Sequence, residues 1–204
     1  MPIPTSPARP ELPIRRVVIV HGYGANPESH WFPWLRELLT AHGIDVTVVP
    51  LPESQAPSAA RWHEAVSTAL AHVDDQTWIV AHSLGAITVL RRLAELPAPW
   101  VLGGAVLVSG FTGRLDVLPD LDAFLADDVD LTAVVSNVLR RHMVYSDNDA
   151  IVPTAASAAL AARLQAHVHV IEGAGHFLDS DGVTTLPAVS ALLGVEDVPA
   201  PRTR

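Results

Sequence analysis

Short runs of apolar, β-branched residues alternate along the chain with longer segments in which apolar residues recur every three or four positions. The short runs predict strands, and the longer segments predict amphipathic helices. Several runs are apolar at consecutive positions, which is typical of strands covered on both faces. We therefore expect six buried strands, at residues 16–20, 45–49, 77–81, 104–108, 142–145 and 168–171.

Helical periodicity fills the intervals between these strands. The predicted helices span residues 31–42, 58–73, 84–96, 131–140, 154–166 and 184–193. Ser58 is a candidate N-cap, and Gly43 and Gly194 stand where helices are expected to end. The alternation predicts an α/β fold with an open, mainly parallel six-stranded sheet and helices on both faces. In such a fold, functional residues are expected at the carboxyl ends of the strands.

Composition narrows the classes of function. We expect residues 14–196 to form a single domain, flanked by a flexible tail at residues 1–13 and a second tail at residues 197–204. The first tail is rich in proline and lacks the apolar stretch of a signal peptide. Cysteine is absent, which excludes a thiolate nucleophile and fits the cytoplasmic location that we predict. The net charge of −9 argues against nucleic-acid and membrane partners.

The segment Ala81-His82-Ser83-Leu84-Gly85 lies directly between a predicted strand and a predicted helix. It matches the nucleophile elbow G-x-S-x-G, with alanine in place of the first glycine. The elbow needs small residues two positions either side of the serine, because strand and helix pass close together there. The pattern predicts Ser83 as a nucleophile, with an ordinary helix N-cap as the alternative, and we expect His82 to point away from the reacting face.

Two further strand ends carry candidate partners for Ser83. His176 follows the sixth predicted strand in a glycine-rich turn, and this position distinguishes it among the ten histidines of the chain. Asp147 and Asp149 follow the fifth predicted strand. A carboxylate there can orient the imidazole and stabilise its protonated form. We therefore predict a Ser–His–Asp triad.

A glycine-containing turn, residues 21–24, follows the first predicted strand. Glycines there let backbone N–H groups approach a substrate oxyanion, so the amides of Tyr23 and Leu84 are the candidate oxyanion hole. The alternative is a plain turn. The turn lacks the G-x-G-x-x-G spacing of a dinucleotide site, and we predict neither a cofactor nor a metal. The residues expected around the substrate pocket are His21, Gly22, Trp31, Phe111 and Phe177.

Together these motifs resemble the YdeN-like, retinoblastoma-binding-protein-9-related small serine hydrolases of the α/β-hydrolase superfamily. The resemblance runs from about residue 17 to residue 193 and rests on residues 21–35, 81–85, 103–111, 146–153 and 173–177. It implies a triad of Ser83, Asp149 and His176, which follow one another in the superfamily's order. Asp149 is preferred to Asp147 because it stands four residues before Pro153, the usual offset in this fold.

The resemblance also implies a compact hydrolase without a full cap domain, since the interval from residue 109 to residue 141 is short. We predict a serine hydrolase that cleaves carboxylic esters with small acyl groups through an acyl-enzyme intermediate. A peptidase or amidase on the same triad, an acyltransferase and a non-catalytic protein-binding module remain alternatives. The expected partner is a small-molecule ester or amide, and the oligomeric state is left open.

Overall fold

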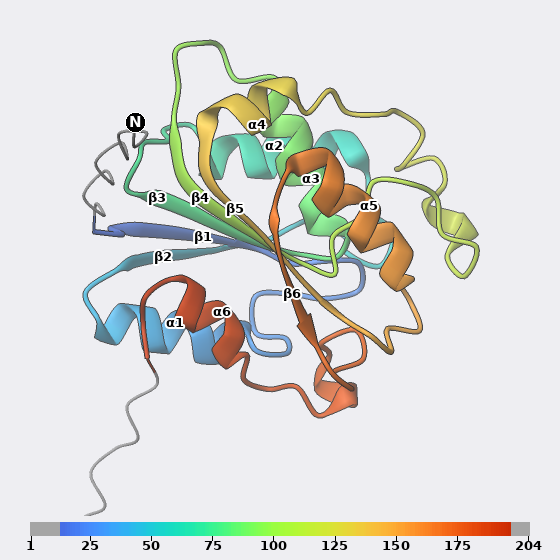
Figure 1. Cartoon of the computed structure of the whole chain (residues 1–204). Helices are drawn as coiled ribbons and strands as arrows, with labels where there is room; N and C mark the ends of the chain where they lie inside the picture. Colours follow the sequence, from blue (N-terminus) through green and yellow to red (C-terminus); the bar gives the residue numbers. More distant parts are fainter. Residues whose placement is uncertain (1–12, 197–204) are drawn as a thin grey trace, which may run out of the picture.

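The computed structural model describes residues 13–196, and its centre is a six-stranded sheet in the order β2-β1-β3-β4-β5-β6 (Figure 1). All neighbouring strands are parallel, so the predicted α/β class is confirmed. The tails expected at residues 1–13 and 197–204 lie, apart from Pro13, outside the described residues. The strands are β1 (Arg16–Val20), β2 (Asp45–Val49), β3 (Thr77–His82), β4 (Leu102–Val108), β5 (Val138–Ser146) and β6 (His167–Ile171).

Helices cover both faces of the sheet (Figure 1). One face carries α1 (Phe32–Ala41) and α6 (Pro187–Leu192); the other carries α2 (Ala59–Ala69), α3 (Leu84–Ala94), α4 (Thr132–Asn137) and α5 (Thr154–Leu164). Side chains of β3 alternate between two apolar cores, with Trp78 and Val80 in one and Ile79 and Ala81 in the other. The central strand is therefore buried on both faces, as consecutive apolar residues predict.

The boundary between α4 and β5 differs from the sequence-based expectation. The helix expected at residues 131–140 ends at Asn137, and β5 begins at Val138. Residues 138–141 contain two arginines and resemble a helix end, yet Val138 is paired with Leu102 of β4. Pairing with a neighbouring strand overrides the weak local preference of these residues.

The last strand was wrongly expected to be buried. β6 lies at the edge of the sheet and pairs only with β5. Val168 and Val170 are 46% and 52% exposed, so one face of β6 is not covered by a helix.

The predictions for the helix ends vary in outcome. Gly43 and Gly194 adopt positive φ after α1 and α6, as expected of residues that end helices, whereas Ser58 precedes α2 without a side-chain capping bond.

Parallel strands bring their carboxyl ends to one edge of the sheet, which is where functional residues are expected in this fold. Between β4 and β5 the chain forms only η1 (Pro119–Leu121) and α4, which is too little for a cap domain. Within residues 13–196, no helix combines the length and apolar character needed to cross a membrane. The site is thus bounded by loops between strands and helices.

Candidate active site

Ser83 lies in the sharp turn between β3 and α3, with φ 53° and ψ −125°. Such a backbone conformation is costly for a residue with a side chain and persists only where the surroundings impose it. A Cβ at Gly85 would lie 2.4 Å from the carbonyl oxygen of His21, and a Cβ at Gly22 would lie 2.8 Å from the Ser83 Cβ. The close packing of β1, the turn after it and α3 therefore requires both glycines, and it holds Ser83 at the sheet edge.

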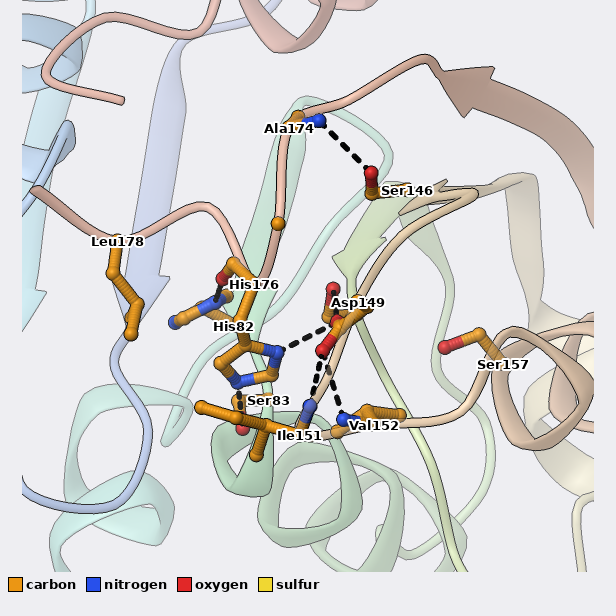
Figure 2. Close-up of polar contacts among 12 residues, drawn as sticks. His82, Ser83, Ser146, Asp149, Ile151, Val152, Ser157, Ala174, His176 and Leu178 are labelled. Carbon is orange, nitrogen blue, oxygen red and sulfur yellow. Dashed lines mark hydrogen bonds and ion pairs between the residues drawn. The ribbon is translucent and has the colours of Figure 1, made fainter. Parts of the chain in front are cut away.

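The three residues predicted as a triad form a hydrogen-bonded chain (Figure 2). The Ser83 hydroxyl is 2.9 Å from Nε2 of His176, and Nδ1 of His176 is 2.7 Å from Oδ2 of Asp149. The side chains of His176 and Asp149 are 6% and 1% exposed. In this order the serine donates to the imidazole, and the imidazole donates to the carboxylate.

Asp149 is held by more than the imidazole. Its Oδ1 accepts hydrogen bonds from the amides of Ile151 and Val152 (Figure 2), and its Oδ2 also accepts one from the Ser109 hydroxyl at 2.8 Å. Burial is the largest influence on the carboxyl and opposes ionisation, but the bonds from His176 and the two amides outweigh it and lower the pKa of Asp149. The carboxylate is therefore ionised beside the imidazole.

Asp147, the alternative acid, is used differently. Its Oδ1 accepts a hydrogen bond from the amide of Gly173 at 2.8 Å, in the loop that precedes His176. The structure thus places Asp149, rather than Asp147, against the imidazole.

The backbone of His176 is fixed from two sides. The carboxylate of Asp181 accepts its amide at 2.8 Å, and Nε2 of His82 donates to its carbonyl oxygen at 2.9 Å. His82 was expected to point away from the reacting face; instead its ring centroid lies 4.9 Å from that of His176. Burial, and secondly the nearby His176, lower the pKa of His82 well below its usual value, so His82 is a neutral donor.

The turn after β1 is braced by His21. Its Nε2 accepts the amide of Leu51 at 3.2 Å, so its Nδ1 carries the proton and donates to the Gly22 carbonyl at 2.9 Å. This turn holds the amide of Tyr23, and the amide of Leu84 is the first in α3. Neither amide donates to an acceptor within residues 13–196, so both can meet an oxyanion near Ser83.

A cavity of about 470 Å³ opens above Ser83 and His176. Of the five residues expected around the pocket, none lines it. Trp31, Phe111 and Phe177 are buried in the two cores, His21 braces its turn, and Gly22 packs against Ser83. Large aromatic rings gain most by complete burial, which explains their placement. The lining residues are Tyr23, Gly24, His30, His82, Ser83, Val117, Leu118, Ala150, Ile151, His176, Leu178, Asp179 and Ser180.

Sequence reasoning missed Ser109, Asp181 and His30 as members of this site. Ser109 had a recognisable position, directly after β4 and at the same sheet edge as the triad. Asp181 ends the short 3-10 helix η2 (Asp179–Asp181), and His30 lies in the turn before α1; neither position carries a strand-end signal. No group of three or more His, Asp or Glu side chains in the described part of the chain is arranged to hold a metal ion.

Comparison with known proteins shows the family of the chain. A family model described as serine hydrolase matches residues 17–195. The chain belongs to this serine hydrolase family. It is 36% identical over 179 residues to the protein named as hydrolase YdeN of Bacillus subtilis (strain 168), which covers 88% of this chain and 94% of that protein.

Two further similarities support the serine hydrolase family assignment. The crystal structure of Bacillus subtilis YdeN superimposes with a TM-score of 0.85, covering 88% of this chain and 97% of that one. The serine hydrolase RBBP9 of Rattus norvegicus is 24% identical over 184 residues, covering 89% of this chain and 96% of that protein. The protein is therefore a serine hydrolase with the α/β-hydrolase fold.

Proposed function

We propose that this serine hydrolase cleaves carboxylic esters with small acyl groups, in the manner of a carboxylesterase, with Ser83, His176 and Asp149 as its catalytic triad. The observation that supports this most directly is the hydrogen-bonded chain from Ser83 through His176 to the buried Asp149. Its geometry is that of an activated serine, because the base is within hydrogen-bond reach and a third group orients it.

In the first half-reaction Ser83 Oγ attacks the ester carbonyl while its proton moves to Nε2 of His176. The amides of Tyr23 and Leu84 stabilise the negative charge on the carbonyl oxygen; one such donor is typically worth about 10²–10³ in rate. Asp149 keeps the Nδ1–H tautomer of His176 in place and stabilises the imidazolium. His176 then gives the proton to the alcohol oxygen, the carbon–oxygen bond breaks, and the acyl group stays on Ser83.

In the second half-reaction water replaces the alcohol. His176 takes a proton from the water as its oxygen attacks the acyl carbon, and then returns that proton to Ser83 Oγ as the acyl bond breaks. The products are one carboxylic acid and one alcohol for each water consumed. A protonated imidazole cannot accept the serine proton, so kcat/KM is expected to fall as the pH is lowered.

Fluorophosphonate labelling tests the triad, because the reagent reacts with activated serines. We expect one adduct, located on Ser83 by peptide mass spectrometry and absent from the variant Ser83→Ala. Ser136→Ala is a matched control, since Ser136 is exposed on α4 and bonds only to its own helix. A folded protein that takes no label would contradict the proposal and favour a non-catalytic binding module.

Substrate panels then separate the remaining alternatives. Ester hydrolysis with little turnover of matched amides is the expected result, whereas preferential amide turnover would indicate a peptidase or amidase. Acyl transfer to an added alcohol in preference to water would indicate an acyltransferase. The cytoplasmic location and the absence of a nucleic-acid partner stay predictions from composition.

A further inference from the structure

Besides His82 and the proposed base His176, a third histidine lines the cavity, His30. His30 lies in the turn before α1, where its side chain is 13% exposed. Its backbone has φ 57°, in the left-handed region that side chains seldom occupy. Strained positions of this kind gather at ligand-binding sites, where the surroundings hold them in place. The conformation brings the ring of His30 against the loop that follows His176.

The contacts of the ring identify the nitrogen that carries its proton. Nδ1 of His30 accepts a hydrogen bond from the backbone amide of Asp179 at 3.1 Å. Burial is the largest influence on the pKa of His30 and lowers it, although Asp179 acts in the opposite sense. The Asp179 carboxylate lies 3.4 Å from the same nitrogen. The closer amide takes the lone pair of Nδ1, so the neutral ring carries its proton on Nε2. No acceptor among residues 13–196 pairs with Nε2, and since His30 lines the cavity, this N–H is available to a ligand there.

The position of His30 assigns it to the leaving-group side of the site. Its ring centroid is 6.0 Å from that of His82, which in turn is 4.9 Å from that of His176. In the proposed reaction His176 must protonate the departing alcohol, so the alcohol lies against the His176 loop. Residues 178–180 of that loop line the same cavity, and the amide of Asp179 is the one that holds His30.

The two parts of the cavity wall differ in polarity. Near His30, the wall includes the exposed carboxylate of Asp179 and Ser180, with Leu178 as the one apolar side chain of that loop segment. The segments after β4 and Asp149 contribute only apolar side chains, namely Val117, Leu118, Ala150 and Ile151. A hydrocarbon chain suits the apolar part, whereas a group rich in hydroxyls suits the polar part.

We propose that His30 determines leaving-group specificity by donating a hydrogen bond from Nε2 to an oxygen of the alcohol. The preferred substrates are then esters of a short apolar acid with a small polyhydroxy alcohol. This inference rests on the proposed function. An apolar alcohol of equal size covers the Nε2–H without replacing its hydrogen bond to water, and sites of that kind discriminate strongly.

The test compares two butyrate esters whose alcohols have the same number of non-hydrogen atoms, 1-monobutyrin and pentyl butyrate. Acid release is followed in a pH-stat at substrate concentrations far below saturation, which yields kcat/KM for each ester. For the wild-type protein we expect 1-monobutyrin to be preferred by roughly tenfold or more. His30→Phe keeps a ring but no donor, and it is expected to lower this preference by roughly tenfold.

Two further variants separate specificity from folding. His30→Gln carries an amide N–H near the position of Nε2 and is expected to retain part of the preference. His63→Phe is the matched control: His63 lies on α2, where it contacts Glu95, and the preference should be unchanged. If His30→Phe does not fold, the wild-type preference and His30→Gln decide the matter.

Fluorophosphonate labelling of the same preparations keeps the two proposals apart. Equal kcat/KM for the two esters in a wild-type protein that labels at Ser83 would overturn the role of His30 alone. A fall in kcat/KM by the same factor for both esters in His30→Phe would also overturn it, because the ring would then only support the His176 loop. A wild-type protein that does not label would overturn the proposed function and this inference with it.

Discussion

Histidines gather in two regions of this protein, and the partners of their ring nitrogens differ. At the carboxyl edge of the sheet, Nδ1 of His176 faces the Asp149 carboxylate and Nε2 faces Ser83. On β5 and β6, Nδ1 of His142 instead faces Nε2 of His169 at 3.1 Å, and the ring of His142 stacks on Trp78. The His176 ring lies between a carboxylate and a hydroxyl, whereas the His142 ring lies between a second imidazole and the indole of Trp78.

The comparison shows that a perturbed histidine does not by itself mark a site. Burial, then the neighbouring His169, His167 and Arg140, lower the pKa of His142 to about 4. Burial also lowers the pKa of His82 beside the proposed triad. Desolvation acts alike in both regions, because it depends only on the loss of water around the ring. The carboxylate behind His176 and the serine in front of it are what distinguish the site.

The largest difference between the two regions is expected from removal of the rings. His176→Ala should lower kcat/KM by about 10⁴–10⁶, since both proton transfers pass through this imidazole. His142→Ala should change kcat/KM little. Steady-state ester hydrolysis measures both variants, with circular dichroism to confirm folding. Comparable losses in the two variants would contradict the assignment of the base.

Removing the charge of Asp149 is expected to have the next largest effect. Asp149→Asn leaves an amide that can donate to Nδ1 and favour the wrong tautomer of His176, which typically costs about 10⁴ in kcat. Asp147→Asn is the control, because an asparagine oxygen can still accept the Gly173 amide that Asp147 holds. Single-turnover acylation rates compare the two. Equal rates in both variants would argue against Asp149 as the acid of the triad.

A smaller effect is expected at Ser109. Its hydroxyl donates to the same Asp149 oxygen that accepts from His176. Ser109→Ala removes this bond, and we expect kcat/KM to fall roughly tenfold because one hydrogen bond to a charged group is lost. Ser157→Ala removes a buried hydroxyl that bonds to the Gly110 carbonyl instead, so it controls for general destabilisation. A similar decrease in both variants would show that Ser109 acts only through stability.

The smallest expected effect is a change in the pH dependence of stability, caused by His142 in the histidine group on β5 and β6. An unfolded imidazole binds its proton near pH 6.5, whereas folded His142 does so at about pH 4. As the pH falls between these values the unfolded state gains the proton first, so stability decreases. Since His142 is partly exposed to solvent, its share is at most about 1–2 kcal/mol.

His142→Phe removes the titrating group and keeps a ring to stack on Trp78. The variant should therefore lose less stability than the wild type between pH 7 and pH 4.5, with a Tm decrease smaller by about 2–6 °C. Differential scanning calorimetry at the two pH values measures this. Buried His82, whose pKa is also lowered, is present in both proteins, so both still lose some stability as the pH falls. An equal decrease in Tm for both proteins would show that His142 does not contribute.

The sequence predicted those parts of the molecule that depend on local patterns. β1 and β2 have the predicted bounds, because each is a short apolar run flanked by turn residues. Gly85 could be recognised as essential because the elbow leaves no room for a Cβ, and the structure shows that contact with the His21 carbonyl. These features need only neighbouring residues to be recognised.

The features that were missed depend on contacts between distant segments. Ser109 bonds to Asp149 across 40 positions of the chain, and the Asp179 amide bonds to His30 across 149. No local pattern encodes either pair. The misplaced pocket residues have a related cause: an aromatic residue such as Trp31 suits a core and a pocket equally by composition, and only the packing of α1 decides between them.

The proposed nucleophile follows β3 and the proposed base lies in the loop after β6, and these two strands differ greatly in burial. β3 is buried at all six positions and pairs on both edges, whereas β6 has a single neighbour and exposed valines. Partial opening of a domain begins where the fewest buried contacts must break. Mild denaturant should therefore release the His176 loop before the centre of the sheet melts. Activity would then be lost while most amides of β3 still resist hydrogen exchange, and the enzyme would recover on dilution without refolding as a whole.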